Sequence, residues 1–291
     1  MLRKLFMLTT IVFVFSAHAV EADVIHSTWV GGEEGDWGQA SNWSPNTVPD
    51  NSSSRTYAVT IDAGSGEVSV GLQQQRTIDR LDCYGEVGLT SWSGWRNLTL
   101  IDVNGLTNYG ELEIYQQVDI QGNVTNTAGA ELYLEESYIT GNLHNLAGGV
   151  IKFEMLNDLE EGDLQNEGTI NIMHASDLLC EQQVSNYGTI NLYSGELDVD
   201  YGIGILDNNS TGVIKGFGVL HTRSLLQNEG QIIAFGGSLT ILSEDSIANT
   251  GTLANKAVSS LHIKPVVDVN NLGTIEVNAG GGVAFDCNMV N

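Results

Sequence analysis

The chain contains little proline and little cysteine. Only 3 of its 291 residues are proline and only 3 are cysteine. Three scattered cysteines cannot build a disulfide framework, and an odd number leaves at least one thiol unpaired. We therefore expect Cys83, Cys180 and Cys287 to be buried thiols in a fold that its core holds together.

Basic residues are also scarce. The chain has 11 Lys and Arg against 36 Asp and Glu, which gives a net charge of −25. Loss of residues 1–19 would remove Arg3 and Lys4 and leave −27. Such a surface repels nucleic acid and anionic membranes, and it repels polyuronates unless cations intervene. The composition therefore excludes a nucleic-acid partner.

The chain has one long hydrophobic run, and it lies at the N-terminus. Arg3 and Lys4 precede the apolar run from Leu5 to Phe15, and Ala17-His18-Ala19 follows it. This order is typical of a secretory signal peptide with an Ala-x-Ala cleavage site, and the run is short for a membrane anchor. We predict a signal peptide at residues 1–19 and a secreted, extracellular or cell-surface protein.

The most prominent feature of the sequence is a repeat. An aliphatic residue stands two positions before an Asn, a Gly follows, and two apolar residues with one residue between them come next, as in Leu164 to Ile172. Successive asparagines recur at an interval of about 20 residues, and a spacing this regular indicates stacked repeats. The asparagines are Asn108, Asn126, Asn145, Asn166, Asn186, Asn208, Asn228, Asn249, Asn271 and Asn291.

The pattern within each repeat predicts strands. Apolar residues alternate with polar ones at period two, which disfavours helix. Asn and Gly tolerate the left-handed backbone that a sharp bend requires, and stacked Asn amides can hydrogen-bond in a ladder. We predict an all-β fold, a single-stranded parallel β-helix (β-solenoid) of about 20 residues per coil, and we expect a right-handed coil. A leucine-rich repeat is the alternative, but Gly usually stands where that repeat has Leu after the Asn.

The segment before the repeats has a different composition. Residues 20–56 are rich in Trp and Gly, and Trp29, Trp37 and Trp43 follow one another closely there. The open end of a solenoid exposes core side chains and unpaired strand edges, so we interpret this segment as an N-terminal cap. A sugar-stacking platform is the alternative. We assign residues 57–107 to irregular first coils and residues 108–291 to regular Asn-Gly repeats.

The last residue, Asn291, is the anchor of a further repeat. A solenoid that ends within a coil leaves its core and its strand edge bare. We therefore expect either a continuation of the chain beyond residue 291 or another chain that covers this end.

The order of motifs near the N-terminus resembles the start of a known group of proteins. Trp29-Val30-Gly31-Gly32, Trp37, Asn42-Trp43 and Pro49 are followed by Val59-Thr60-Ile61-Asp62 and Val68-Ser69-Val70. This order is similar to that in secreted bacterial parallel β-helix proteins of the pectin-lyase-like and autotransporter types. The resemblance implies the fold. It leaves the activity open, because that group includes adhesins, stalks, surface-layer material and polysaccharide-degrading enzymes.

Some aromatic residues are candidate glycan contacts. Tyr193, Phe217 and Phe235 take equivalent positions on consecutive coils, about 4.8 Å apart if the coils stack as parallel strands. Trp92 and Trp95 belong to a segment that we expect to project as a loop. Aromatic faces suit a polysaccharide. The alternatives, which we favour, are core stacking for the row of three and packing over a neighbouring coil for the Trp pair.

No catalytic or metal-binding motif stands out. Glycoside hydrolases need paired carboxylates in one cleft, and a lyase needs a basic proton acceptor. Lys215 and Arg223 are the nearest candidates for such a base, but no acidic cluster accompanies them in the sequence. The acidic run Asp158–Asp163 and the segment Asp198-Val199-Asp200 are interpreted as solvated rather than as cation sites. The histidines of the repeats lack metal-ligand spacing and are interpreted as surface or turn residues, namely His144, His174, His221 and His262.

The sequence therefore predicts a secreted or cell-surface scaffold with a structural or adhesive role, without a cofactor. Short uniform coils without long insertions favour this function. A carbohydrate-binding module is the alternative, with a polysaccharide or a cell-surface glycan as partner. A polysaccharide lyase or glycoside hydrolase on the same fold is a third hypothesis.

Overall fold

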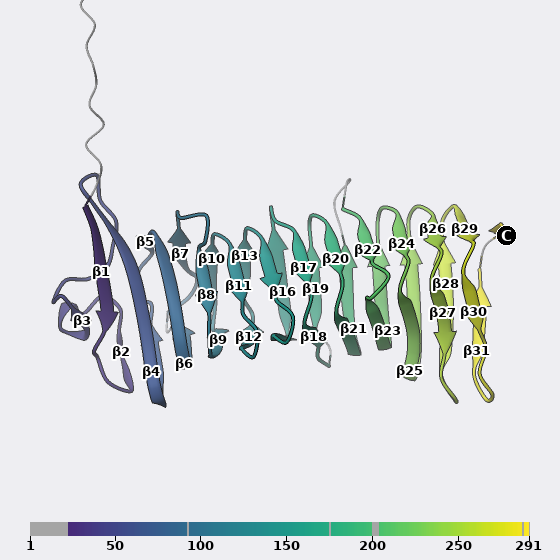
Figure 1. The fold of residues 1–291 in the computed structure, drawn as a ribbon, viewed down its shortest axis with the longest axis horizontal. Helices are drawn as coiled ribbons and strands as arrows, with labels where there is room; N and C mark the ends of the chain where they lie inside the picture. The colour runs from purple at the N-terminus through teal and green to yellow at the C-terminus, as the bar shows by residue number, and fades with distance from the viewer. Residues whose placement is uncertain (1–22, 92, 175, 200–203, 287, 291) are drawn as a thin grey trace, which may run out of the picture.

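The computed structural model describes residues 23–91, 93–174, 176–199, 204–286 and 288–290 (Figure 1). Within them the fold is all-β, with one short 3-10 helix at Ala40–Asn42. The strands form a parallel β-solenoid of about 11 turns with ~21 residues per turn. This confirms the predicted fold class. In the described part of the chain no helix is long and apolar enough to cross a membrane. The predicted signal peptide and Trp92 lie outside the described residues.

Each regular coil contributes three short strands, so the solenoid has three faces. In one coil these are β14 (Leu143–Asn145), β15 (Val150–Glu154) and β16 (Leu156–Glu160). They pair in parallel with β17 (Leu164–Asn166), β18 (Thr169–Ile172) and β19 (Asp177–Cys180) of the next coil. We call the three stacks the first, second and third face. Figure 1 shows the coils side by side along one axis.

The other strands extend these faces. The first face also contains β8 (Leu106–Asn108), β11 (Val124–Asn126), β20 (Val184–Asn186), β22 (Leu206–Asn208), β24 (Leu226–Asn228), β26 (Ile247–Asn249), β29 (Asp268–Asn271) and β32 (Asn288–Val290). The second contains β9 (Glu111–Tyr115), β12 (Glu131–Glu135), β27 (Thr252–Asn255) and β30 (Thr274–Glu276). The third contains β7 (Arg96–Leu100), β10 (Val118–Gln121), β13 (Tyr138–Thr140), β28 (Ser260–Pro265) and β31 (Gly282–Phe285). Three long strands bend from the second face into the third, namely β21 (Thr189–Val199), β23 (Val213–Thr222) and β25 (Gln231–Ser243).

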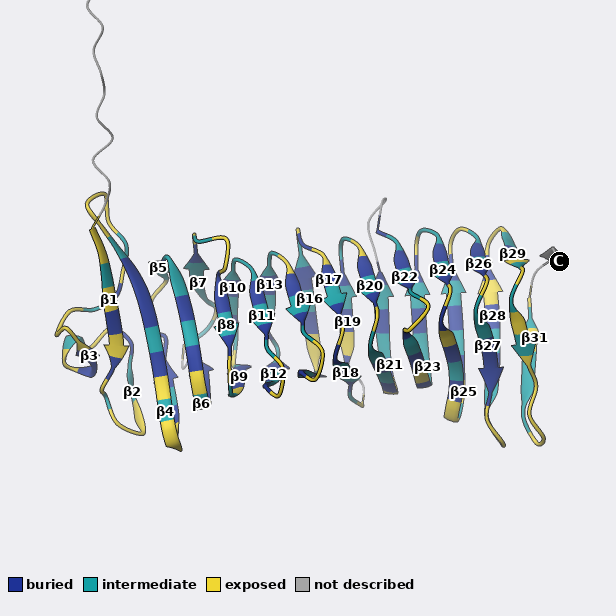
Figure 2. Cartoon of the chain, viewed as in Figure 1, coloured by how far each residue is buried: buried dark blue, intermediate teal, exposed yellow. Residues whose placement is uncertain are grey.

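The core follows from the alternation of each strand. In Figure 2 buried residues alternate along the strands with more exposed ones. The aliphatic residue of each Leu-x-Asn segment is buried, and so are the alternate apolar residues of the other two faces, such as Ile170 and Leu178. Burial of one such side chain contributes about 1.5–3 kcal/mol. Because every coil repeats the pattern, the core is a continuous column.

The repeat asparagines point into this column. The amide Nδ2 of each donates a hydrogen bond to Oδ1 of the Asn one coil further on, over 2.6–2.9 Å, from Asn108 to Asn271. Several amides also donate to a backbone carbonyl of the next coil, as Asn145 does to Thr169 at 3.2 Å. Asn108 to Asn249 of this ladder are fully buried. The ladder thus satisfies amide groups that would otherwise lie unpaired in the core.

Most Asn and Gly positions of this corner do not adopt the left-handed backbone that the sequence predicted, although Gly129 and Gly148 do. None of the ladder asparagines that the structure describes has a positive φ, and neither does Gly188, Gly230 or Gly251. The glycines are needed because the coils approach each other closely. A Cβ on Gly188 would lie 2.1 Å from the carbonyl oxygen of Gly168, and one on Gly230 would lie 2.2 Å from that of Gly212.

Non-glycine residues with a left-handed backbone are concentrated at the bend from the second to the third face. Gln116, Gln117, Glu136, Met155 and Ser194 have φ between 47° and 68° there. None of these five side chains is buried, so the bend accepts residues other than glycine in these coils.

The N-terminal end has a tryptophan core of its own. Trp29, Trp37 and Trp43 are at most 5% exposed, with ring centroids 5.0 Å apart for Trp29 and Trp43 and 4.7 Å apart for Trp37 and Trp43. The indole of Trp43 donates to the Trp37 carbonyl at 2.7 Å, and that of Trp37 to the Pro49 carbonyl at 3.0 Å. Buried rings offer no face to a sugar, which disfavours the sugar platform and supports a cap.

The first coils are built from longer strands than the regular repeats. β1 (Asp23–Trp29) and β2 (Glu34–Asp36) pair in parallel with β4 (Arg55–Gly71), which pairs with β6 (Arg80–Thr90). β3 (Trp43–Ser44) is antiparallel to β1, and β5 (Arg76–Ile78) pairs with β7. Figure 1 shows β1, β2 and β3 at the N-terminal end of the solenoid, beside the long strand β4 with which β1 and β2 pair.

Candidate functional site

An exposed aromatic row lies at the bend between the second and third faces. Tyr193 is in register with Phe217, and Phe235 follows on the next coil. Tyr193 is 40% exposed, Phe235 is 60% exposed and Phe217 is partly buried. The interpretation that we favoured, core stacking, is wrong. Each ring follows an inward residue (Leu192, Gly216 or Ala234), so the alternation of the strand turns it outward.

Two shallow hollows adjoin this row. One of about 300 Å³ is lined by all three rings together with Asn191 and Lys215. The other, of about 390 Å³, shares Lys215 and Phe235 and adds Ile233 and Lys256. Lys215 and Lys256 are exposed. The row therefore combines apolar ring faces with two cationic side chains on a strongly acidic protein, a surface that suits a saccharide ring with acidic substituents.

A second aromatic site lies near the beginning of the third face. Trp95 is 41% exposed and its ring meets that of Tyr138 edge to face at 4.7 Å. Tyr138 stands two coils further on, so Trp95 packs over neighbouring coils and still presents part of its surface. With Asp119 and Glu160 the two rings line a recess of about 320 Å³.

Two carboxyl groups in this recess, those of Asp119 and Glu160, have raised pKa values. Burial, followed by the negative charge of Glu160, raises the pKa of Asp119 to about 6. Burial also raises the pKa of Glu160, with Glu181 and Asp158 as further causes. Oδ1 of Asp119 has no hydrogen-bond partner among the described residues. A carboxyl group that titrates near neutrality can exchange a proton with a bound ligand.

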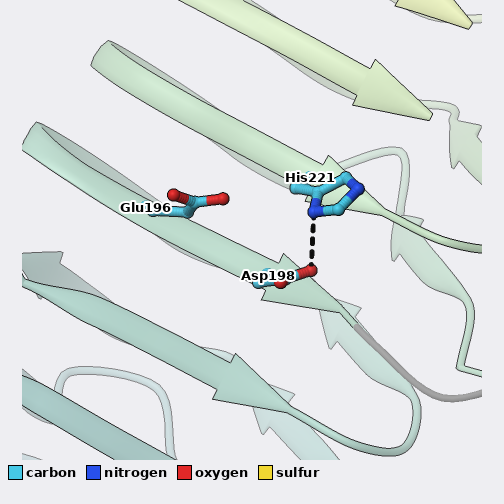
Figure 3. Close-up of side chains that lie close together, drawn as sticks. All are labelled: Glu196, Asp198 and His221. Carbon is cyan, nitrogen blue, oxygen red and sulfur yellow. Dashed lines mark ion pairs between the residues drawn. The ribbon is translucent and has the colours of Figure 1, made fainter.

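A third group joins β21 and β23 on the third face. Asp198 is in register with His221 on the next coil, and His221 Nδ1 lies 3.0 Å from Asp198 Oδ1 (Figure 3). Glu196 stands two residues before Asp198 and so projects from the same side of the strand. His221 Nε2 lies 3.6 Å from Glu244 Oε1, and Arg223 Nε lies 3.8 Å from the same oxygen.

This grouping corrects two interpretations of the sequence. Acidic side chains do accompany Arg223 and His221, because Glu244 comes from the next coil and reaches both of them. His221 is a member of a cluster and not an isolated surface histidine. Spacing along the chain could not find it, since its members come from consecutive coils. One signal in the sequence could have found this cluster. Residues 196–199 alternate between acidic and apolar residues, which predicts a strand whose acidic residues face outward, and residues 177–180 and 219–222 lie about one repeat before and after them.

The remaining residues that the sequence singled out form no ligand-binding or reactive site in the described part of the chain. The ladder asparagines from Asn108 to Asn249 are fully buried and cannot meet a ligand, and Asn291 lies outside the described residues. Cys83 and Cys180 are fully buried free thiols, and burial raises the pKa of both, so they are unreactive. Cys287 and Asp200 lie outside the described residues. Leu159 of the run Asp158–Asp163 points into the core, while Asp158 and Glu160 face outward.

Comparison of the chain with protein-family models, with curated proteins and with solved structures finds no match.

Proposed function

We propose that this protein is a secreted or cell-surface scaffold, a stiff rod with a structural or adhesive role. The observation that carries the proposal is the unbroken asparagine ladder from Asn108 to Asn271 within a continuous aliphatic core. Each coil is bound to the next on three faces, which favours a rigid column over a hinged one. About 11 turns that rise ~4.8 Å each give a column of about 53 Å.

Export is part of the proposal. It is supported by the signal-peptide pattern in residues 1–19 and by the resemblance of the opening motifs to secreted bacterial β-helix proteins. The test is expression of the full chain in a bacterium, followed by cell fractionation and N-terminal sequencing. We expect an exported chain that begins at Val20. An uncleaved chain that stays in the cytoplasm would overturn this part.

The exposed aromatic row favours a second candidate function, glycan binding. Tyr193, Phe217 and Phe235 offer ring faces along the column axis, the direction in which an extended polysaccharide could run. Lys215 and Lys256 beside the row favour an acidic polysaccharide. The rod would then present a sugar-binding strip and act as an adhesive surface.

A panel of neutral and acidic polysaccharides separates the hypotheses. Retention without cleavage supports the glycan-binding rod, cleavage products support a lyase or hydrolase, and neither result supports a purely structural rod. In the binding case we expect Phe235→Ala and Tyr193→Ala each to weaken retention roughly threefold to tenfold, the value of one ring contact. Tyr187→Ala is the matched control, because Tyr187 is 44% exposed but outside the row.

A further inference from the structure

The Glu196, Asp198 and His221 side chains have the composition of a metal site. Each offers one ligand atom, and these atoms all lie within 4.8 Å of one another. In the part of the chain that the structure describes, this is the one group of three or more such residues that comes so close. A bound zinc ion, with bonds of about 2.0–2.2 Å to nitrogen and oxygen, needs its ligand atoms about 3–4 Å apart. The three ligand atoms lie close to that separation, and His221 Nδ1 is already 3.0 Å from Asp198 Oδ1.

The three ligands stand on two paired strands, β21 and β23. β21 and β23 pair in parallel over ten residue pairs that include Asp198 with His221. Inward neighbours such as Leu197 and Leu220 are fully buried and fix the outward direction of the ligands. All three ligands are half-buried, so the site is sheltered but open to solvent.

The carboxylate of Glu244 faces the ring nitrogen of His221 that does not face Asp198. His221 Nδ1 faces Asp198, and its other ring nitrogen, Nε2, lies 3.6 Å from Glu244. A carboxylate on the distal ring nitrogen orients a metal-binding histidine and raises its basicity, and loss of such a partner typically costs tenfold or more in metal affinity. Glu244 is therefore a positioning residue and not a ligand.

The charge balance favours a cation. Asp177 is in register with Glu196, Asp198 faces His221, and Glu244 faces both His221 and Arg223, so four carboxylates on neighbouring coils accompany two basic side chains. A divalent ion between Glu196 and Asp198 would offset the repulsion between these neighbouring carboxylates.

We propose that Glu196, Asp198 and His221 bind a divalent transition-metal ion, with His221 Nδ1 and one oxygen of each carboxylate as ligands. The imidazole nitrogen selects zinc-like ions over calcium, which prefers six to eight oxygen ligands. Water molecules complete the coordination on the solvent side.

The test is titration of the purified full chain with ZnCl₂ by calorimetry, and with CoCl₂ by visible absorption. We expect one site of higher affinity than the remaining acidic surface, with d–d bands for bound Co²⁺. Glu196→Gln and His221→Ala should each weaken Zn²⁺ binding at least tenfold and abolish those bands. Glu244→Gln should weaken binding while the Co²⁺ bands persist, because the ligands remain.

His144→Ala is the matched control. His144 also faces one carboxylate, Glu167 at 3.3 Å, but belongs to no such cluster among the described residues. This variant should bind Zn²⁺ as the unmodified chain does. Circular dichroism checks that each variant is folded, and the isosteric Glu196→Gln preserves side-chain shape if His221→Ala does not fold. Equal binding by Glu196→Gln and the unmodified chain, or tighter binding of Ca²⁺ than of Zn²⁺, would overturn the proposal.

Discussion

At the scale of single residues, burial decides how much the same hydrogen bond contributes. The solenoid carries Asn-to-Asn bonds both inside and outside. Asn166 donates to Asn186 at 2.8 Å within the core, and Asn191 donates to Asn171 at 2.8 Å on the outer side of the second face. Water can replace the partner of Asn191 but not that of Asn166.

We predict that Asn166→Ala lowers the free energy of unfolding by about 2–4 kcal/mol, because it leaves the amides of Asn145 and Asn186 short of a partner in the core. Asn191→Ala should cost less than about 1 kcal/mol. Urea unfolding followed by circular dichroism measures both. Equal losses would contradict a structural role for the inner ladder.

The titration of Asp119 gives a second residue-scale prediction. Its pKa in the folded chain is about 6, above the ordinary value of 3.8, chiefly because of burial and then because of Glu160. The folded state thus holds the proton more tightly than the unfolded state does. The contribution of Asp119 to stability is therefore highest below pH 3.8, falls as the pH rises to about 6, and stays low above it.

Asp119→Asn should accordingly stabilise the chain at pH 7, by about 1 kcal/mol once solvent screening of a half-exposed group is allowed for. Near pH 4 the variant and the unmodified chain should unfold at nearly the same urea concentration. A stabilisation of equal size at both pH values would show that charge is not its cause.

At the scale of elements, the close approach of neighbouring coils controls which residues the corners accept. The repeat glycines stand against the backbone of the preceding coil, whereas Gly66 stands at ordinary contact distance from its neighbours. A Cβ on Gly230 would meet the Gly212 oxygen at 2.2 Å, but one on Gly66 would meet its nearest neighbour, the Ala63 oxygen, at 3.7 Å. Both residues have φ outside the left-handed region.

We predict that Gly230→Ala destabilises the chain by about 1–3 kcal/mol or more, since the coils must separate to admit the methyl group. Gly66→Ala should be neutral or stabilising by up to about 1 kcal/mol, because it restricts the unfolded chain without a clash. Thermal unfolding of the two variants side by side is the measurement. If Gly230→Ala leaves the melting temperature unchanged, the coils can separate without loss of stability, which contradicts the prediction.

At the scale of the whole molecule, stacking in register converts an acidic composition into columns of like charge. Glu67, Glu86, Glu111 and Glu131 follow one another across consecutive coils. Burial raises the pKa of the neighbouring Glu113, and the charges of Glu111, Glu67, Glu86 and Glu131 raise it further. Like charges directly opposite each other destabilise paired strands.

The melting temperature should therefore rise when NaCl increases from about 10 mM to about 300 mM, because salt screens this repulsion. Glu111→Gln should stabilise the chain at low salt by about 0.2–1 kcal/mol and reduce its salt dependence. Glu276→Gln is the control, since its cross-strand neighbour is Ala254. If the melting temperature does not change with salt, repulsion between the stacked glutamates does not destabilise the fold.

The sequence alone was sufficient for the solenoid, because the regular return of the Asn-Gly motif and the period of two within each repeat are local properties that every coil shows again. The handedness of the coil stays a prediction. Only the tertiary structure decided which residues meet across coils. The spacing of the asparagines aligned the first face, whereas the meeting of Glu196 and Asp198 with His221 depends on which third-face residues pair across coils. The outward turn of Tyr193, Phe217 and Phe235 depends on which alternate residues of each strand enter the core. Both arise from packing between neighbouring coils.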